Sequence, residues 1–145
     1  MPSINETQIA ALLDNFAEAV HTRNLERVMS CYSRDLVEFD VTPPLKASVN
    51  DARKAWQMCF EMSMGPVGYE IRDRQIAARD DLGVAFGLLH FTTMNRPDRK
   101  KMDMWMRWTA AFRKVNGEWK IVHEHDSFPI DMTTDKAVTN LRPNG

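Results

Sequence analysis

The chain has 145 residues, a formal net charge of -1 and 27% charged residues. That length suits one domain with a proper hydrophobic core. The intermixed charges leave no basic stripe for nucleic acid, and no apolar run approaches the roughly 20 residues of a membrane span. The N-terminus lacks a signal-peptide pattern, and Cys31 and Cys59 are expected to be free thiols on helical faces. We therefore expect a cytoplasmic protein with no nucleic-acid or membrane partner.

Three helices are expected in the first half of the chain. Ser3 opens the first in a capping-box pattern, and the apolar residues that follow recur at helical spacing. Asn24 caps a shorter second helix that reaches Tyr32, and Ser48 caps a third. Between the second and third helices, residues 36–41 (L-V-E-F-D-V) are expected to form a short strand, which the following prolines close.

From residue 67 onward the apolar period changes from helical to two residues, which indicates long strands. The expected strands cover residues 67–79, 84–94, 102–115 and 117–130. Helices followed by an antiparallel meander predict an α+β fold: a cone-like, curved antiparallel sheet with three N-terminal helices packed in its concave side. We expect residues 1–130 to form this single domain and residues 131–145 to form a polar C-terminal tail.

The last of these strands, G-E-W-K-I-V-H-E-H-D-S-F-P-I at residues 117–130, is the most informative stretch of the chain. Strict alternation puts Trp119, Ile121, His123, His125 and Ser127 on one face, and Lys120, Val122, Glu124 and Asp126 on the other. A face that is apolar at one end and carries imidazoles at the other is typical of a pocket with a hydrogen-bonding end. We therefore predict a small-molecule site on the histidine face.

Whether a cation joins that pocket depends on the turn at Asn116-Gly117. A two-residue turn places Arg107 and Thr109 on the face opposite the histidines. A three-residue turn with a bulge at the glycine places Arg107 opposite His125 and Thr109 opposite His123. We favour the bulged register, because it gathers an apolar patch on the outer face of the sheet, where a homodimer partner would cover it. That patch comprises Met104, Met106, Trp108, Ala110 and Phe112.

The order of these elements, ending in G-E-W-K-I-V-H-E-H-D-S, resembles the nuclear transport factor 2-like superfamily. Within it, the chain is similar to SnoaL-like and ketosteroid-isomerase-related domains over Ile9 to Pro129. The resemblance implies a cone with a pocket inside and a homodimer formed across the sheet. The fold hosts isomerases, cyclases, dehydratases, hydrolases and inert binding modules, so the fold by itself does not select an activity.

The resemblance also implies a role for Asp40. The stretch from Phe16 through L-V-E-F-D resembles the first third of ketosteroid isomerase, and Asp40 falls where that enzyme keeps its proton-transferring carboxylate. A buried carboxylate there would have a raised pKa and could shuttle a proton, whereas an acidic residue that merely ends an edge strand would bond a loop amide. Phe16 stands in place of the enzyme's tyrosine, and the residues around Arg107 lack its second acid, so its oxyanion hole is lost or replaced.

Three histidines offer a second set of candidates. His90 falls where the association domain of calcium/calmodulin-dependent kinase, which the chain also resembles, carries a pocket arginine. With His123 and His125 it would form either a three-histidine metal site or a hydrogen-bonded cluster that lines the pocket. We favour the cluster and expect no metal and no cofactor. His125, paired with Asp126 or Asp40, is the second candidate base.

These interpretations converge on a small-molecule-binding protein whose ligand is apolar and carries a carbonyl or carboxylate. If it is an enzyme, we expect cofactor-free proton transfer of the isomerase, dehydratase or cyclase type, with Asp40 or His125 as catalytic base. The alternative is a non-catalytic ligand-binding or assembly module. The predicted ligand-binding residues are His90, Arg107, Thr109, His123, Phe16, Trp56 and Trp105.

Overall fold

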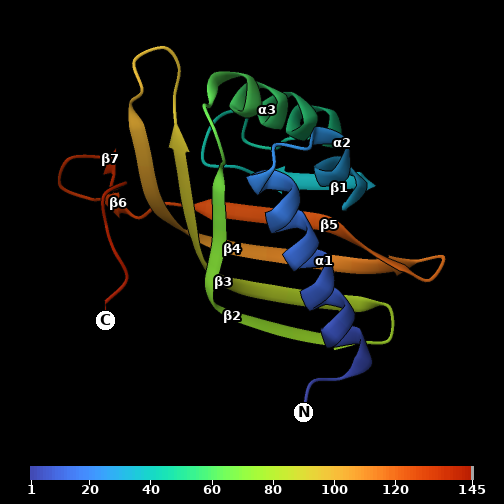
Figure 1. Cartoon of the computed structure of the whole chain (residues 1–145). Coiled ribbons are helices and arrows are strands. Elements are labelled where there is room, and N and C mark those ends of the chain that lie inside the picture. The colour runs from blue at the N-terminus through green and yellow to red at the C-terminus, as the bar shows by residue number, and fades with distance from the viewer. Residues whose placement is uncertain (145) are drawn as a thin grey trace.

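The computed structural model of the chain describes residues 1–144 (Figure 1). The helices are α1 (Ile4–His21), α2 (Leu25–Ser30) and α3 (Val49–Met62). The strands are β1 (Tyr32–Phe39), β2 (Gly68–Arg79), β3 (Leu82–Met94), β4 (Lys101–Val115), β5 (Glu118–Ser127), β6 (Ile130–Asp131) and β7 (Lys136–Ala137). The expected α+β fold, with helices on the concave side of a curved sheet, is confirmed.

Five strands form one sheet in the order β1-β5-β4-β3-β2. Strands β2 to β5 are antiparallel, as predicted, whereas β1 runs parallel to β5, so the sheet is mixed. Strand β1 also begins earlier than expected, because Tyr32 pairs with Ile121 instead of ending α2. The short β6–β7 hairpin lies in the predicted tail. No helix within residues 1–144 is both long enough and apolar enough to span a membrane.

The helices begin where their capping residues predict. Ser3 and Glu6 form a capping box at α1, Asn24 caps α2, and Ser48 opens α3 with a second capping box. Helix α1 packs across the concave face of the sheet (Figure 1) and buries one apolar stripe against it. The buried residues of that stripe are Ile9, Leu13, Phe16, Ala19 and Val20. We call this concave, helix-covered side the inner face and the other side the outer face.

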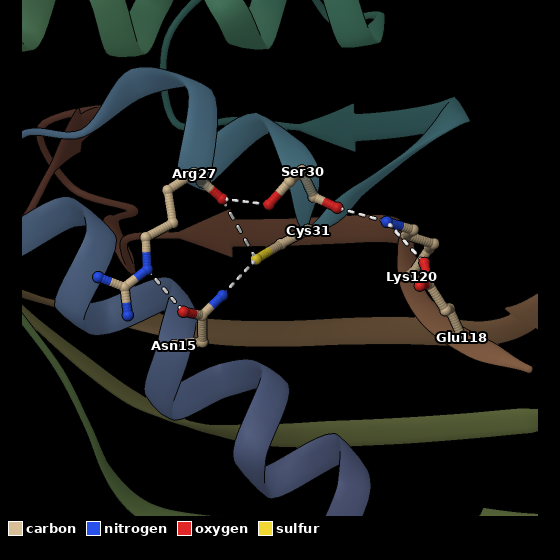
Figure 2. A network of polar contacts seen from close by, with 6 residues as sticks. All are labelled: Asn15, Arg27, Ser30, Cys31, Glu118 and Lys120. Atoms are coloured by element: carbon tan, nitrogen blue, oxygen red, sulfur yellow. Dashed lines mark hydrogen bonds and ion pairs between the residues drawn. The ribbon is translucent and has the colours of Figure 1, made fainter.

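A polar network fastens the helices to β5 where β1 begins (Figure 2). The Nε of Arg27 in α2 donates to Asn15 Oδ1 of α1 at 2.7 Å, and Asn15 Nδ2 lies 3.6 Å from Cys31 Sγ. From β5, Lys120 Nζ donates to the Ser30 carbonyl at 2.6 Å, and the backbone N–H of Ile121 donates to the Cys31 carbonyl at 2.8 Å. These contacts give hydrogen-bond partners to the carbonyl groups at the C-terminal end of α2 and align β1 beside β5.

The β4–β5 turn is the two-residue form, so the favoured three-residue register is wrong. Val115 pairs with Glu118, and Asn116 and Gly117 both have positive φ, at 52° and 81°. This is the backbone conformation that two-residue hairpins favour, because its twist matches that of the strands. Neither predicted register holds further along the hairpin, however, because β5 contains a bulge at Val122.

The bulge decides which residues of β5 face inward. Phe112 pairs with Ile121 but Ala111 pairs with His123, so Val122 is an extra residue that interrupts the alternation. As a result Glu124 follows Ile121 onto the inner face, whereas His123 moves to the outer face. The predicted histidine face was therefore wrong.

The two-residue turn, for its part, reverses the predicted facing of the apolar patch of β4, because it pairs Phe112 with the inward-facing Ile121. Met106, Trp108, Ala110 and Phe112 are all buried on the inner face, within the main core. Arg107 pairs with Ser127 and Thr109 with His125, both on the outer face.

Candidate functional site

A cavity of about 180 Å³ opens on the inner face, between α3 and the sheet. All five strands of the sheet or their ends contribute to its wall. The lining residues are Glu38, Asp40, Val41, Ala55, Trp56, Cys59, Tyr69, Leu89, Phe91, Met104, Met106, Glu124 and Asp126. We call it the inner cavity. Its wall is apolar and aromatic except where the ends of β1 and β5 meet, and no arginine, lysine or histidine among the described residues lines it.

Four carboxyl groups form the polar end of the inner cavity. They come from two stretches of the same spacing, V-E-F-D in and after β1 and H-E-H-D in β5. The parallel pairing of these strands sets Glu38 beside Glu124. Asp40 and Asp126 each follow two residues later, so both lie at the same end of the cavity. The alternation of a strand then presents all four carboxyl groups on one face.

Glu124 is held by hydrogen bonds from three aromatic side chains. Tyr32 Oη donates to its Oε1 at 3.1 Å, and Trp108 Nε1 and Tyr69 Oη donate to its Oε2 at 2.8 Å and 3.4 Å. Trp56 Nε1 in turn donates to Tyr32 Oη at 3.1 Å. Glu124 is only 3% exposed, so these donors replace the water that its carboxylate has lost. Glu124 is thus a fixed acceptor at the back of the cavity.

Burial also changes the pKa values of the two neighbouring acids, Glu38 and Asp126. Desolvation, the charge of Glu124 and a hydrogen bond with it raise the pKa of Glu38 to about 10. Burial, followed by the charges of Glu124 and Asp40, raises the pKa of Asp126 well above its ordinary value. Like charges resist ionising together at close range in a poorly solvated site, so Glu38 holds its proton at neutral pH and the pKa of Asp126 is shifted in the same direction. A neutral carboxylic acid is both a hydrogen-bond donor and an acid.

Asp126 is the acid of this group with unused hydrogen-bonding capacity. Its Oδ1 atom is buried and has no hydrogen-bond partner within residues 1–144, although buried polar atoms are almost always paired. By contrast, the Oδ1 of Asp40 accepts the backbone N–H of Val41 at 2.7 Å. The cavity therefore combines an apolar wall with one acid that lacks a partner and one that is held at the edge.

Two of the predicted site residues lie at the inner cavity. Asp40 stands at its polar end and Trp56 in its wall. Phe16 lies behind that wall, only 1% exposed, with edge-to-face ring contacts to Tyr69 at 5.2 Å and to Tyr32 at 5.5 Å. Phe16 therefore supports the aromatic side chains that surround Glu124 instead of lining the cavity.

The other predicted residues lie on the outer face, away from this cavity. His123 Nδ1 donates to the Val37 carbonyl at 2.6 Å, and Phe39 packs edge-on against His123 and His125. His125 is exposed, as are Arg107 and Thr109.

His90 stands apart from the other two histidines. Its ring stacks on Trp105, with ring centroids 4.2 Å apart, and its Nε2 lies 2.7 Å from Asp103 Oδ1. His90, His123 and His125 therefore do not converge, and in the described part of the chain no group of three or more histidine, cysteine, aspartate or glutamate side chains is arranged to hold a metal ion.

Sequence reasoning missed Glu38 and Glu124, and it named Asp126 only as a partner of His125, although all three acids join Asp40 at the inner cavity. Strict alternation from Trp119 assigned Glu124 and Asp126 to the outer face, because a single-residue bulge leaves no mark in the residue pattern. The repeated E-x-D spacing in two stretches was the signal that could have found them. Two strands that repeat this spacing bring four carboxyl groups together if they pair in register.

The chain belongs to the SnoaL-like domain family, which matches residues 9–131. A nuclear transport factor 2-like protein of unknown function from Pseudomonas putida KT2440 is similar at 30% identity, with 99% of each chain covered and a TM-score of 0.85. No curated protein matches the chain.

Two more distant solved structures share the fold. A ketosteroid isomerase-like protein from Erwinia carotovora atroseptica is 17% identical, with 87% of this chain and 97% of that chain covered and a TM-score of 0.72. A candidate dehydratase of the nuclear transport factor 2-like family from Streptomyces avermitilis is 13% identical, with 90% and 100% covered and a TM-score of 0.77. At these identities the likeness extends to the fold alone.

Proposed function

We propose that the inner cavity binds a neutral apolar molecule that carries a carbonyl or hydroxyl group, and that its carboxyl groups transfer a proton without a cofactor. The observation that carries this proposal is the buried, unpartnered Oδ1 of Asp126 at the end of an apolar wall. A ligand oxygen or hydroxyl would complete its hydrogen bonding. The acidic lining disfavours a carboxylate ligand, because like charges would meet in a poorly solvated space.

In this proposal the acids have separate roles. Protonated Asp126 donates a hydrogen bond to the ligand carbonyl, and Asp40 removes a proton from the adjacent carbon. The electron pair of the broken C–H bond moves into the carbonyl group and forms an enolate, whose oxygen Asp126 stabilises. In a ligand with a β,γ double bond, return of the proton from Asp40 to the γ carbon completes an isomerisation. In a ligand with a β-hydroxyl group, departure of that hydroxyl with the proton from Asp40, as water, completes a dehydration. The dehydratase and isomerase names of distant structural neighbours are in keeping with this class of chemistry.

Exchange of carbon-bound protons tests the proposal without knowledge of the natural substrate. In D₂O, we expect the protein to accelerate exchange of the α protons of 2-tetralone, a neutral bicyclic ketone, as followed by proton NMR. Asp40→Asn and Asp126→Asn should each lower the catalysed rate about 100-fold or more, the usual contribution of a positioned acid or base. Asp80→Asn, at the exposed β2–β3 turn, is the matched control and should leave the rate unchanged.

Two outcomes would contradict the proposed enzymatic activity. Binding of the ketone with no accelerated exchange would favour the alternative, a non-catalytic binding module, whose ligand raises the melting temperature without a product. Failure of the ketone to bind, or exchange that persists in both variants, would remove the assignment of this cavity as the active site.

We also propose that the outer face forms a homodimer. Leu82, Val84 and Phe86 of β3 are exposed by 54%, 40% and 45% and point to that face, although a solvated strand normally presents polar residues there. Light scattering should give twice the chain mass for the wild type and a monomer for Phe86→Glu. Met62→Glu, which places the same charge on exposed α3, is the control. A monomeric wild type would contradict the dimer.

A further inference from the structure

A second cavity, of about 170 Å³, lies on the outer face, beneath the C-terminal segment. Leu88, Trp105 and Arg107 of β3 and β4 form its floor, and Leu141 to Pro143 form its cover. We call it the tail cavity. Within residues 1–144 it shares only Met106 with the inner cavity, and it has the opposite charge, because two arginines and no acidic side chain of that range line it.

Arg107 is the cation that faces this space with unused donors. Its Nε donates to Ser127 Oγ at 3.1 Å, which leaves both terminal amino groups of the guanidinium without a protein acceptor in the described residues. No carboxylate within residues 1–144 lies at ion-pair distance from it. Two parallel N–H groups on a planar guanidinium match the two oxygens of a carboxylate.

The nearby acid does not compete for Arg107. Asp103 is already engaged by His90, at 2.7 Å, and by Arg142, whose Nη1 lies 3.7 Å from its Oδ1 and also donates to its carbonyl at 3.2 Å. Arg72 adds a third guanidinium, 5.5 Å from the centre of the Trp105 ring. The surroundings of the tail cavity therefore carry a net excess of positive charge.

The rest of the cavity wall is apolar. Leu88, Pro129, Leu141 and Pro143 enclose it, and Trp105 supplies an aromatic surface whose orientation is set by the stacked ring of His90. A multiply charged, strongly hydrated anion such as phosphate would lose its water against these groups without replacement. An anion with one charge and an apolar body would keep its carboxylate on Arg107 and bury the body.

We propose that the tail cavity binds a small organic monocarboxylate, with its charge on Arg107 and its apolar group between Trp105 and the C-terminal segment. This site is separate from the inner cavity and does not depend on the function proposed for it. The chain thus has one cavity for a neutral molecule on the inner face and one for a monoanion on the outer face.

Calorimetric titration of the full chain with benzoate tests this site. We expect benzoate to bind the wild type and to bind Arg107→Met at least tenfold more weakly, since the substitution keeps an unbranched apolar stem but removes the charge. Arg113→Met, further along the same strand and face, is the matched control and should bind as the wild type does. Benzamide, which has the same shape without the charge, and inorganic phosphate should both bind at least tenfold more weakly than benzoate.

Four results would overturn the proposal. They are no binding of benzoate to the wild type, equal binding to Arg107→Met, phosphate or benzamide binding as tightly as benzoate, or benzoate binding that is lost in Asp126→Asn instead. The last would place the anion in the inner cavity. Amide chemical shifts recorded during the titration give the location directly, because only a ligand in the tail cavity perturbs Trp105 and Leu141 while sparing Ala55.

Discussion

The two faces of the β4–β5 hairpin carry opposite chemistry within a few residues of each other. Inside, Glu124 and Asp126 lie in a dry, aromatic wall without a basic neighbour. Outside, His125 and Arg107 are exposed to solvent. The difference shows that the environment, and not the residue type, sets the role of an ionisable group. Burial raises the pKa of Glu38 and Asp126 on the inner face, whereas the hydrogen bond from His90 lowers the pKa of Asp103 on the outer face.

The largest expected effect is on stability, from Glu124. Glu124→Ala leaves Tyr32, Tyr69 and Trp108 without their acceptor in the core, and each unpaired donor costs its full desolvation. We expect a loss of about 3 to 5 kcal/mol in the free energy of unfolding, as measured by urea denaturation. Glu118→Ala, at the exposed start of the same strand, should change it by less than about 0.5 kcal/mol. Comparable losses for the two variants would mean that Glu124 is not held as described.

The second prediction concerns pH. Below about pH 4.5 Glu38 is protonated whether the chain is folded or unfolded; between 4.5 and about 10 only the folded chain keeps the proton. Stability therefore falls as pH rises through this window. Glu38→Gln removes that loss while still donating to Glu124, so its free energy of unfolding should exceed that of the wild type by an amount that grows steadily from pH 5 to pH 9.

Denaturation curves at several pH values measure this difference. Glu118→Gln supplies the control, because its exposed carboxylate is not part of the cavity and its curve should stay parallel to that of the wild type. Parallel curves for Glu38→Gln as well would show that Glu38 is ionised in the folded protein. Asp126 would then be the one acid of the inner cavity with a raised pKa.

The fold was predictable because its signals are local. The capping residues Ser3, Asn24 and Ser48 mark where helices begin, and the two-residue period of the second half marks strands. The parallel pairing of β1 was not predictable in this way, since it joins segments that are distant in the chain. Trp56 lies at the inner cavity because helical spacing fixes the side of α3 on which it stands.

The site was harder to predict because it depends on which residues of one strand, β5, face inward. The bulge at Val122 exchanges the faces of every residue after it, so His123 and His125 were assigned to the pocket that Glu124 and Asp126 occupy. Nothing in the side chains around Val122 favours a bulge over regular alternation. Asp40 was assigned to the pocket through family resemblance. It lies just beyond the end of an edge strand, where the alternation of residues no longer predicts which way a side chain points.

Two neighbouring residues of β5 allow a direct test of which side chains point into the inner cavity. Asp126→Asn and His125→Asn change adjacent side chains on opposite faces of the sheet. In titrations with 2-tetralone followed by thermal denaturation, Asp126→Asn should weaken binding about fivefold, the worth of one hydrogen bond near 1 kcal/mol, and His125→Asn should leave it unchanged. The reverse result would restore the strict alternation of β5 and place the histidines inside.

The smallest expected effect is the most direct measure of the contrast between the faces. Asp103 of β4 lies on the outer face, where the hydrogen bond from His90, helped by the charge of Arg142, holds its pKa below the ordinary value of 3.8 against the opposing effect of burial. The stability that this shift contributes is present above pH 3.8 and lost as pH falls below it, the opposite sign to Glu38. In NMR titrations of the carboxyl carbons, His90→Gln should move the midpoint of Asp103 up toward 3.8.

Asp131 is the internal control for that titration. Its pKa is also lowered, but by hydrogen bonds from Thr133, so His90→Gln should leave its midpoint where it is. If Asp103 titrates at its ordinary value in the wild type, the His90 contact does not persist in solution and Trp105 loses the ring that orients it. If instead Asp103 titrates low while Asp126 of the wild type titrates well above 3.8, two aspartates on opposite sides of one sheet have shifted in opposite directions. Side-chain type cannot explain that difference, whereas the face of the sheet on which each aspartate lies does.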